Sequence, residues 1–141
     1  MSQKPFKILG IEHIGIAVEN FDGLSTIFSD IFGLKNIGSE EVIDQHVLTE
    51  IFDTGRGKLE FLQATNPKSP ITRFINNQGE GMHHIALLVD QLEPALDYLT
   101  NKGIKLIDKI PRVGAEGFSI AFLHPVRIGS PSPINKLSKF R

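Results

Sequence analysis

A segment repeated in the two halves of the chain is the feature that most limits its fold. Residues 13–21 (HIGIAVENF) match residues 84–92 (HIALLVDQL) position by position in chemical type, at an offset of 71 residues, 84 minus 13, in a chain of 141. Each copy starts with the apolar sequence of a strand and leads into a helix. A repeat at half the chain length predicts two copies of one structural unit.

The same order of elements follows each copy. An apolar stripe at helical spacing comes first, and Gly33 and Gly103 end the two predicted helices. Strand-like runs separated by turn residues come next. The unit is therefore strand, helix and two or three strands, used twice. The stripes are Leu24, Ile27, Phe28, Ile31 and Phe32, then Leu92, Ala95, Leu96 and Leu99; the runs are 41–52 and 58–63, then 105–109 and 118–123.

The length and the connecting segment predict one domain built from two modules. A chain of 141 residues is about one domain long. Ser69 and Pro70 are typical of a helix N-terminus and predict a short helix between the modules. We therefore expect a single domain, 1–141, with module one at about 7–65, the connecting helix at about 69–77 and module two at about 80–141.

Composition excludes several classes of protein. Apolar residues make up 40% of the chain and charged residues 22%, and the net charge is -1, which is typical of a globular protein and points to no nucleic-acid partner. No run has the roughly 18 apolar residues of a membrane span, and residues 1–7 lack the apolar stretch of a signal peptide, so we expect a cytoplasmic protein. The chain has no cysteine. A bound metal would therefore need histidine, carboxylate or amide ligands.

Two of the five histidines occupy equivalent places in the repeat. Because side chains alternate along a strand, His13 shares its face with Gly15 and Ala17, and His84 has the matching place in the second copy. Glu60 alternates to the face opposite its two apolar neighbours, and a carboxylate in mid-strand needs a partner or a ligand. Each residue alone fits a structural role, but together they form a set of two nitrogens and one oxygen that suits Zn, Ni, Co, Mn or Fe(II).

Six segments of the chain resemble the vicinal oxygen chelate superfamily and, within it, the methylmalonyl-CoA epimerase family. The sequences GEGMHHIA and PRVGA are the most specific to the epimerase branch. The resemblance implies an α+β fold in which tandem βαβββ modules form an open, barrel-like mixed sheet around a metal cleft. The matching segments are 11–18, 57–62, 69–74, 79–86, 111–115 and 122–125.

The resemblance also implies the metal ligands and exposes one departure. His13, Glu60 and His84 match the family's ligands for a divalent metal ion such as Co, Zn, Ni or Mn, whereas His83 alternates to the other face and is expected to be structural. The family's fourth ligand is a glutamate near the end of the last strand, where this chain has Ile134. No carboxylate side chain follows Glu116, and prolines at 131 and 133 argue against a regular last strand.

The chemistry implied by the resemblance is the interconversion of the two stereoisomers of methylmalonyl-CoA through a metal-stabilised enolate. It needs proton-transfer groups on opposite faces of the substrate. The family uses glutamates, and the one missing near the C-terminus is one of them. Glu50 is the candidate for the other, with Thr49 matching the position almost as well. Arg112, Gly114 and Ala115 are candidates for binding the substrate through the guanidinium and backbone N–H groups.

Alternative functions stay open at this point. A set of two histidines and one carboxylate also suits a glyoxalase-I-like lyase or a relative of the Fe(II) dioxygenases. The departure at the C-terminus favours a non-catalytic protein that binds a small molecule. Members of the superfamily are often dimers, so the resemblance implies a homodimer. It also implies an acyl-CoA substrate as the binding partner. His46 is expected at the surface, His124 in a turn, and Lys136, Lys139 and Arg141 near CoA phosphates or in a frayed tail, with Leu137 and Phe140 as possible dimer contacts.

Overall fold

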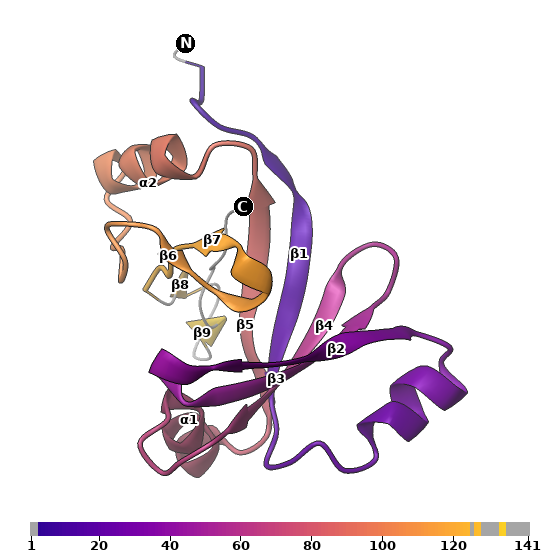
Figure 1. The fold of residues 1–141 in the computed structure, drawn as a ribbon. Coiled ribbons are helices and arrows are strands. Elements are labelled where there is room, and N and C mark those ends of the chain that lie inside the picture. The colour runs from indigo at the N-terminus through magenta and orange to yellow at the C-terminus, as the bar shows by residue number, and fades with distance from the viewer. Residues whose placement is uncertain (1–2, 125, 128–132, 135–141) are drawn as a thin grey trace. The chain divides into compact units, whose positions relative to one another are not determined.

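The computed structural model describes residues 3–124, 126–127 and 133–134 (Figure 1). The chain divides into two compact units, one of residues 13–83 and one that combines residues 1–12 with 84–141. Strands β1 (Ile8–Ala17) and β5 (Gly81–Val89) each run from one unit into the other. The division falls near the boundaries of the predicted modules, and their union into one domain stays a prediction.

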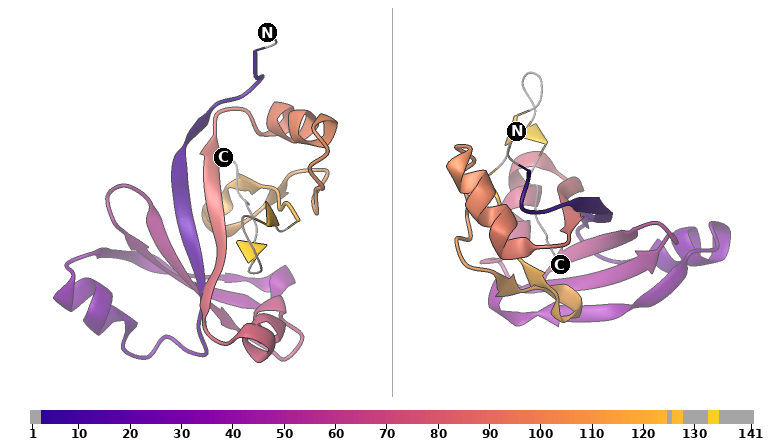
Figure 2. Two further views of the ribbon diagram at one scale, coloured as in Figure 1. Left: turned by 180° about the vertical axis from the view of Figure 1, so that it is seen from behind. Right: turned by 90° about the horizontal axis from the view of Figure 1, so that it is seen from above.

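A five-stranded mixed sheet, which confirms the predicted α+β class, is the main structural feature. Its strand order is β2-β3-β4-β1-β5. Strand β1 pairs with β4 in parallel, whereas β3 pairs with both β2 and β4 in antiparallel (Figure 2). The remaining bounds are β2 Lys35–Val42, β3 Val47–Asp53 and β4 Lys58–Ala64.

One face of the sheet in residues 13–83 packs on aromatic rings. Phe52 and Phe61 are 0% and 3% exposed, and the Phe28 ring lies 5.5 Å and 4.9 Å from them, measured between centroids. Leu24 belongs to the same cluster. The segment at residues 21–34 is thereby fixed onto the sheet.

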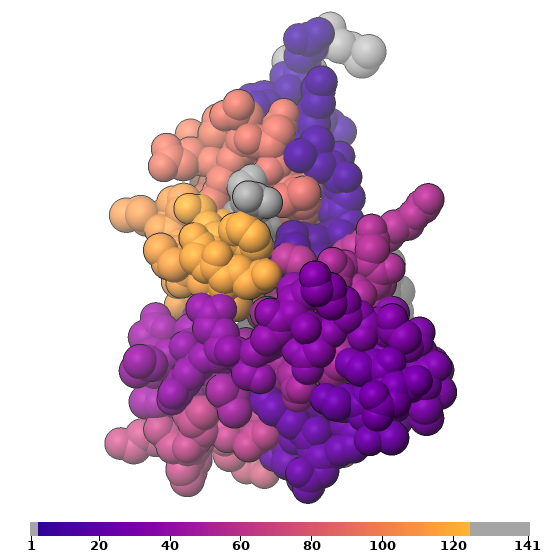
Figure 3. All heavy atoms as spheres, turned by 45° about the vertical axis from the view of Figure 1, so that its right-hand side comes forward, coloured from indigo at the N-terminus to yellow at the C-terminus, as the bar shows by residue number. Residues whose placement is uncertain are grey.

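The predicted first helix is shorter and wider than its apolar stripe suggested. Residues Thr26–Ile31 form a π-helix, in which the Phe32 N–H donates to the Ile27 carbonyl at 3.0 Å. Leu24 and Phe28 of the stripe pack against the sheet, whereas Ile27, Ile31 and Phe32 are exposed. The segment that carries them, dark violet in Figure 3, lies at the surface. Gly33 follows it with a φ of 75°, as the predicted stop requires.

Replacing Phe52 with alanine is expected to lower the free energy of unfolding by about 3 to 5 kcal/mol, the usual cost of truncating a fully buried phenylalanine. Equilibrium urea unfolding measures this change. Phe32→Ala is the matched control, because its ring is 62% exposed and its loss should cost far less. Equal losses in the two variants would contradict the position of the core.

A tight turn interrupts the run at 41–52, which the sequence had suggested as one strand. Strand β2 ends at Val42, a short 3₁₀ turn follows at Ile43–Gln45, and β3 starts at Val47. His46 closes the turn in the left-handed region with a φ of 54°, and its carbonyl accepts a hydrogen bond from Thr65 N at 2.9 Å. The single-strand prediction was wrong because the turn contains no glycine or proline that would mark it in the sequence. His46 is half-buried rather than at the surface.

Helix α1 (Pro70–Gln78) confirms the predicted connecting helix. The Ser69 hydroxyl accepts a hydrogen bond from Ile71 N at 3.2 Å, and proline occupies the first turn. Ile71 packs with Ala17 and Leu62, which belong to the sheet face that carries His13. The helix therefore covers one end of that face.

The unit containing residues 84–141 has one long helix and short strands. Helix α2 (Leu92–Asn101) buries Ala95 and Leu96, which confirms the second stripe. The predicted strands at 105–109 and 118–123 are mostly irregular, because the Asp108 carboxylate takes the N–H of Phe122 that a ladder would use. Among the described residues after α2, the paired strands are β6 (Arg112–Val113) with β7 (Ser119–Ile120) and β8 (Val126–Arg127) with β9 (Pro133–Ile134), and Leu106 and Leu123 form an isolated bridge. A 3₁₀ turn, Ala115–Gly117, joins β6 to β7.

The tail is described only at β8 and β9, which pair antiparallel with each other. The predictions for Lys136, Leu137, Lys139, Phe140 and Arg141 lie outside the described residues. Among the residues that are described, no helix has the length and apolar character needed to cross a membrane.

Candidate active site

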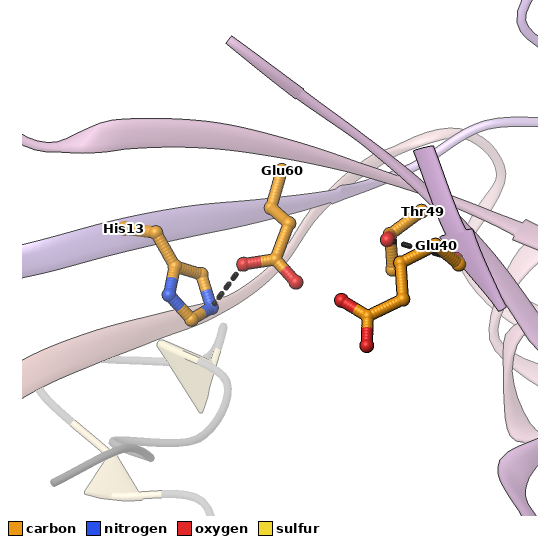
Figure 4. Close-up of polar contacts among 4 residues, drawn as sticks. All are labelled: His13, Glu40, Thr49 and Glu60. Carbon is orange, nitrogen blue, oxygen red and sulfur yellow. Dashed lines mark hydrogen bonds and ion pairs between the residues drawn. The ribbon is translucent and has the colours of Figure 1, made fainter. Parts of the chain in front are cut away.

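His13 and Glu60 meet on neighbouring parallel strands. The register of β1 and β4 places Gly15 beside Glu60 and His13 beside Lys58. Gly15 has no side chain on this face, so the Glu60 carboxylate can reach His13. His13 Nε2 and Glu60 Oε2 lie 3.2 Å apart, and the two residues are 2% and 3% exposed (Figure 4). The structure thus brings together two of the three predicted metal ligands.

The oxygen at this contact fits a metal ligand. Glu60 Oε2 is buried and makes no hydrogen bond, so its contact with His13 is close but lacks hydrogen-bond geometry. A buried carboxylate oxygen without such a partner is costly. Bonds of about 2.1 Å to one metal ion would hold two neighbouring ligand atoms about 3.0 to 3.4 Å apart. The observed separation lies within that range.

A metal ion at this pair would need at least one further ligand. In the described part of residues 13–83, no further His, Asp or Glu side chain completes a metal-binding group around His13 and Glu60. His84 is the ligand that the repeat predicts. It is 6% exposed, and its ring stands edge-on to Phe122 with 6.1 Å between centroids. The ring of His83 instead lies 4.9 Å from Phe74 of α1, in keeping with its expected structural role.

Glu40, which was not predicted from the sequence, shares the sheet face of Glu60. Strand β2 pairs Glu40 with Thr49, and β3 pairs Thr49 with Leu62, two residues from Glu60. The Thr49 hydroxyl donates to the Glu40 carbonyl oxygen at 3.0 Å, and the Glu40 carboxylate extends toward the space beside Glu60 (Figure 4). The turn at Ile43–Gln45 is the missing signal. With that turn known, β2 is a separate strand, and the alternation of its side chains identifies Glu40 as a candidate.

Glu50, the predicted proton-transfer residue, points to the opposite face. It pairs with Phe61 in the sheet, and its Oε1 accepts hydrogen bonds from Asn36 Nδ2 at 2.8 Å and Ser25 Oγ at 3.4 Å. Side chains alternate along β3, so the position of Thr49 on the Glu60 face sends Glu50 away from it. Glu50 therefore lies on the face away from Glu60, where it ties the segment at residues 21–36 to the sheet.

The predicted substrate-binding residues lie together in the other unit. Arg112 forms an ion pair with Asp108, with 3.2 Å between Nε and Oδ2, and its guanidinium carbon lies 4.8 Å from the centre of the Phe122 ring. Gly114 N donates to the Phe118 carbonyl at 2.8 Å, and Ala115 is buried. Arg112 is thus available to an anion, whereas Gly114 and Ala115 build the turn beside it. His124 is exposed, and its N–H donates to the Lys105 carbonyl at 3.0 Å.

Replacing Gly114 with alanine is expected to lower the free energy of unfolding by about 1 to 3 kcal/mol, the usual cost of overpacking. A Cβ atom there would lie 2.6 Å from Cδ1 of the buried Ile120. Thermal unfolding of Gly114→Ala alone and combined with Ile120→Val measures the clash, because valine lacks Cδ1. The alanine should cost less in the valine background, and equal costs would contradict the clash.

The fold and the His13–Glu60 pair are typical of one class of protein, and the sequence comparison identifies that class. The profile of the Glyoxalase/Bleomycin resistance protein/Dioxygenase superfamily matches residues 12–122. The chain belongs to this superfamily.

The similar proteins include methylmalonyl-CoA epimerases and one protein named as uncharacterized. The chain is 36% identical to the uncharacterized protein YqjC of Bacillus subtilis, over 82% of each chain. It is 31% identical to the mitochondrial methylmalonyl-CoA epimerase of Dictyostelium discoideum, over 82% of this chain and 70% of that protein. A variant of the Streptomyces coelicolor methylmalonyl-CoA epimerase, solved with 2-nitronate-propionyl-CoA, is 27% identical with a TM-score of 0.77, covering 84% of this chain and 86% of that one.

Proposed function

We propose that this chain is a metal-dependent epimerase that interconverts the two stereoisomers of methylmalonyl-CoA. The observation that carries the proposal is the buried His13–Glu60 pair, with a carboxylate oxygen that lacks a hydrogen bond, on the sheet face that also holds Glu40. The relatives named methylmalonyl-CoA epimerase support the choice of substrate. A cytoplasmic location stays part of the proposal.

His13, Glu60 and His84 would hold the metal, whose identity among Co, Zn, Ni and Mn is left open. A divalent ion in this place supplies Lewis acidity that stabilises negative charge on the thioester oxygen. The burial of His13 and Glu60 keeps water from competing for these donors. Arg112 would bind an anionic group of the substrate, with the turn at Gly114 and Ala115 holding the loop in place.

Glu40 is the residue we assign to proton transfer in place of Glu50. Its carboxylate would take the proton from the carbon next to the thioester carbonyl, a role that a glutamate on a strand can fill when its backbone is held. The β2–β3 pairing and the Thr49 hydroxyl hold that backbone. Epimerisation also needs a group on the other face, and the position where the resemblance places that glutamate is occupied by Ile134.

The same departure favours a second candidate function, a superfamily member that binds an acyl-CoA without turning it over. The position expected to carry the family's last glutamate is Ile134. Such a protein would keep the metal and the ligand site but lack one proton-transfer group. Turnover, rather than binding, separates the two candidates.

Exchange of the substrate's α-proton in heavy water tests the proposal. The metal-loaded protein is incubated with one stereoisomer of methylmalonyl-CoA in D₂O, and deuterium incorporation and stereochemistry are followed together. We expect deuterium to be incorporated at the α-carbon and the other stereoisomer to form. Exchange without inversion would show that the base at Glu40 works but that no second group returns the proton. The absence of both, with metal bound, would support the non-catalytic alternative.

A homodimer is the assembly we propose. Ile8, Leu9 and Ile11 in the first half of β1 are each more than half exposed, and because neighbouring strand residues alternate they offer apolar surface on both sides of the strand. Light scattering coupled to size-exclusion chromatography measures the mass in solution, and a monomer at micromolar concentration would contradict the proposal.

A further inference from the structure

Asp108 is fixed to the backbone of Phe122 from two sides. Its N–H donates to the Phe122 carbonyl at 3.1 Å, and its Oδ2 accepts a hydrogen bond from Phe122 N at 2.8 Å. The N–H of Ile107 donates to the same Phe122 carbonyl at 2.8 Å. A carboxylate held in this way has little freedom to reorient. It can therefore serve as a fixed anchor for a neighbouring cation.

Arg112 is anchored along one edge only. Its Nε lies 3.2 Å from Asp108 Oδ2 in an ion pair that lacks hydrogen-bond geometry, its guanidinium lies over the Phe122 ring, and the side chain is 38% exposed. Among the residues that the structure describes, its terminal Nη groups make no hydrogen bond or ion pair. A guanidinium has a second edge of two parallel N–H groups that matches a carboxylate in bidentate fashion. Asp108 leaves that edge to a ligand.

The anion-binding edge lies near a candidate ligand of the metal. The Phe122 ring contacts both Arg112, at 4.8 Å, and His84, at 6.1 Å. The guanidinium carbon is therefore no more than 10.9 Å, the sum of those distances, from the centre of the His84 ring. In methylmalonyl-CoA the free carboxylate is attached to the reacting carbon, whereas the whole pantetheine arm separates that carbon from the phosphates. Proximity to His84 favours the carboxylate.

We propose that Arg112 recognises the free carboxylate of the acyl group and that Asp108 is the positioning residue that aims the guanidinium at it. This inference rests on the proposed function and adds a determinant of specificity: the protein would distinguish acyl-CoA thioesters that carry a second carboxylate from those that do not. The cation over Phe122 is partly desolvated, which strengthens its interaction with an anion.

Binding of two ligands that differ only in the carboxylate tests the inference. Isothermal titration calorimetry with methylmalonyl-CoA and propionyl-CoA keeps the thioester, the pantetheine arm and the phosphates constant. We expect Arg112→Lys to lower the affinity for methylmalonyl-CoA about 10- to 100-fold, because lysine cannot make the bidentate contact. The affinity for propionyl-CoA should change by less than about twofold. This measurement needs no turnover, so a protein that binds but does not epimerise still tests the site.

Asp108→Asn tests the positioning role. Its amide oxygen can still accept the hydrogen bond from Phe122 N, so the loop should keep its thermal midpoint while the ion pair is lost. We expect methylmalonyl-CoA to bind about 3- to 10-fold more weakly, because a contact of ordinary hydrogen-bond strength that orients the guanidinium is lost, and propionyl-CoA to bind as before. In an active enzyme the same change should raise KM more than it lowers kcat. Lys109→Gln, which removes an exposed neighbouring charge, should affect both ligands by less than about twofold.

Three results would overturn the proposal. Equal weakening of both ligands by Arg112→Lys would assign Arg112 to a CoA phosphate or to the fold. Unchanged binding of both ligands would show that Arg112 does not contact the bound ligand. A wild-type protein that binds the two ligands equally would show that the carboxylate is not recognised.

Discussion

Replacing Glu40 with glutamine is expected to lower kcat for methylmalonyl-CoA epimerisation by about 10²- to 10⁴-fold, the usual contribution of a proton-transfer group. Glutamine keeps the size of the side chain but cannot take a proton at neutral pH. The β2–β3 pairing and the Thr49 contact use only the Glu40 backbone, so they survive the change. A coupled assay for the product stereoisomer measures kcat, and deuterium exchange reports the proton abstraction itself.

Two neighbouring glutamates make this prediction specific. Glu41→Gln is the matched control, because Glu41 is exposed and pairs with Leu48 on the opposite face of the sheet. It should leave kcat within about twofold, as a distant surface charge does. Glu50→Gln should affect stability through its contacts with Asn36 and Ser25. A large loss of kcat in Glu50→Gln together with an active Glu40→Gln would restore the assignment made from the sequence.

The contrast between Glu40 and Glu50 shows what the sequence can predict. Strand alternation placed His13 and Glu60 on one face correctly, because each lies in an uninterrupted strand whose apolar neighbours fix the phase. Alternation could not place Glu40, because the turn at Ile43–Gln45 resets the phase and carries no glycine or proline to mark it. A shift of one residue exchanges the two faces of a strand.

Tertiary contacts account for the other differences. The stripe at residues 24–32 has the spacing of an α-helix, but the packing of Phe28 on Phe52 and Phe61 accompanies a π-helix that leaves Ile31 exposed. In the second half of the chain, the Asp108 carboxylate replaces a backbone partner. Neither contact can be read from periodicity, because each depends on which distant residue meets the segment.

Removing His13 is expected to abolish stoichiometric metal binding. His13→Gln should weaken the affinity for Co²⁺ or Zn²⁺ by at least about 100-fold, since even the outer partners of metal ligands contribute about 10- to 100-fold. Glutamine fills most of the imidazole's volume and leaves the Glu60 carboxylate a hydrogen-bond donor, which limits the cost of a buried unpaired charge. Metal content after dialysis and the visible spectrum of the Co²⁺ form measure the loss.

Variants of the other histidines decide between a metal site and a simple ion pair at His13 and Glu60. His84→Gln should lose the metal as His13→Gln does, because the repeat predicts equivalent roles for the two residues. His124→Gln is the control, since its ring is exposed and its backbone alone is hydrogen-bonded to Lys105. If the wild-type protein bound no divalent metal, the 3.2 Å contact would be a direct contact of His13 with Glu60 and nothing more, and the Lewis-acid part of the proposed function would fall with it. If His13→Gln lost the metal but His84→Gln kept it, the third ligand would have to be sought outside the repeat.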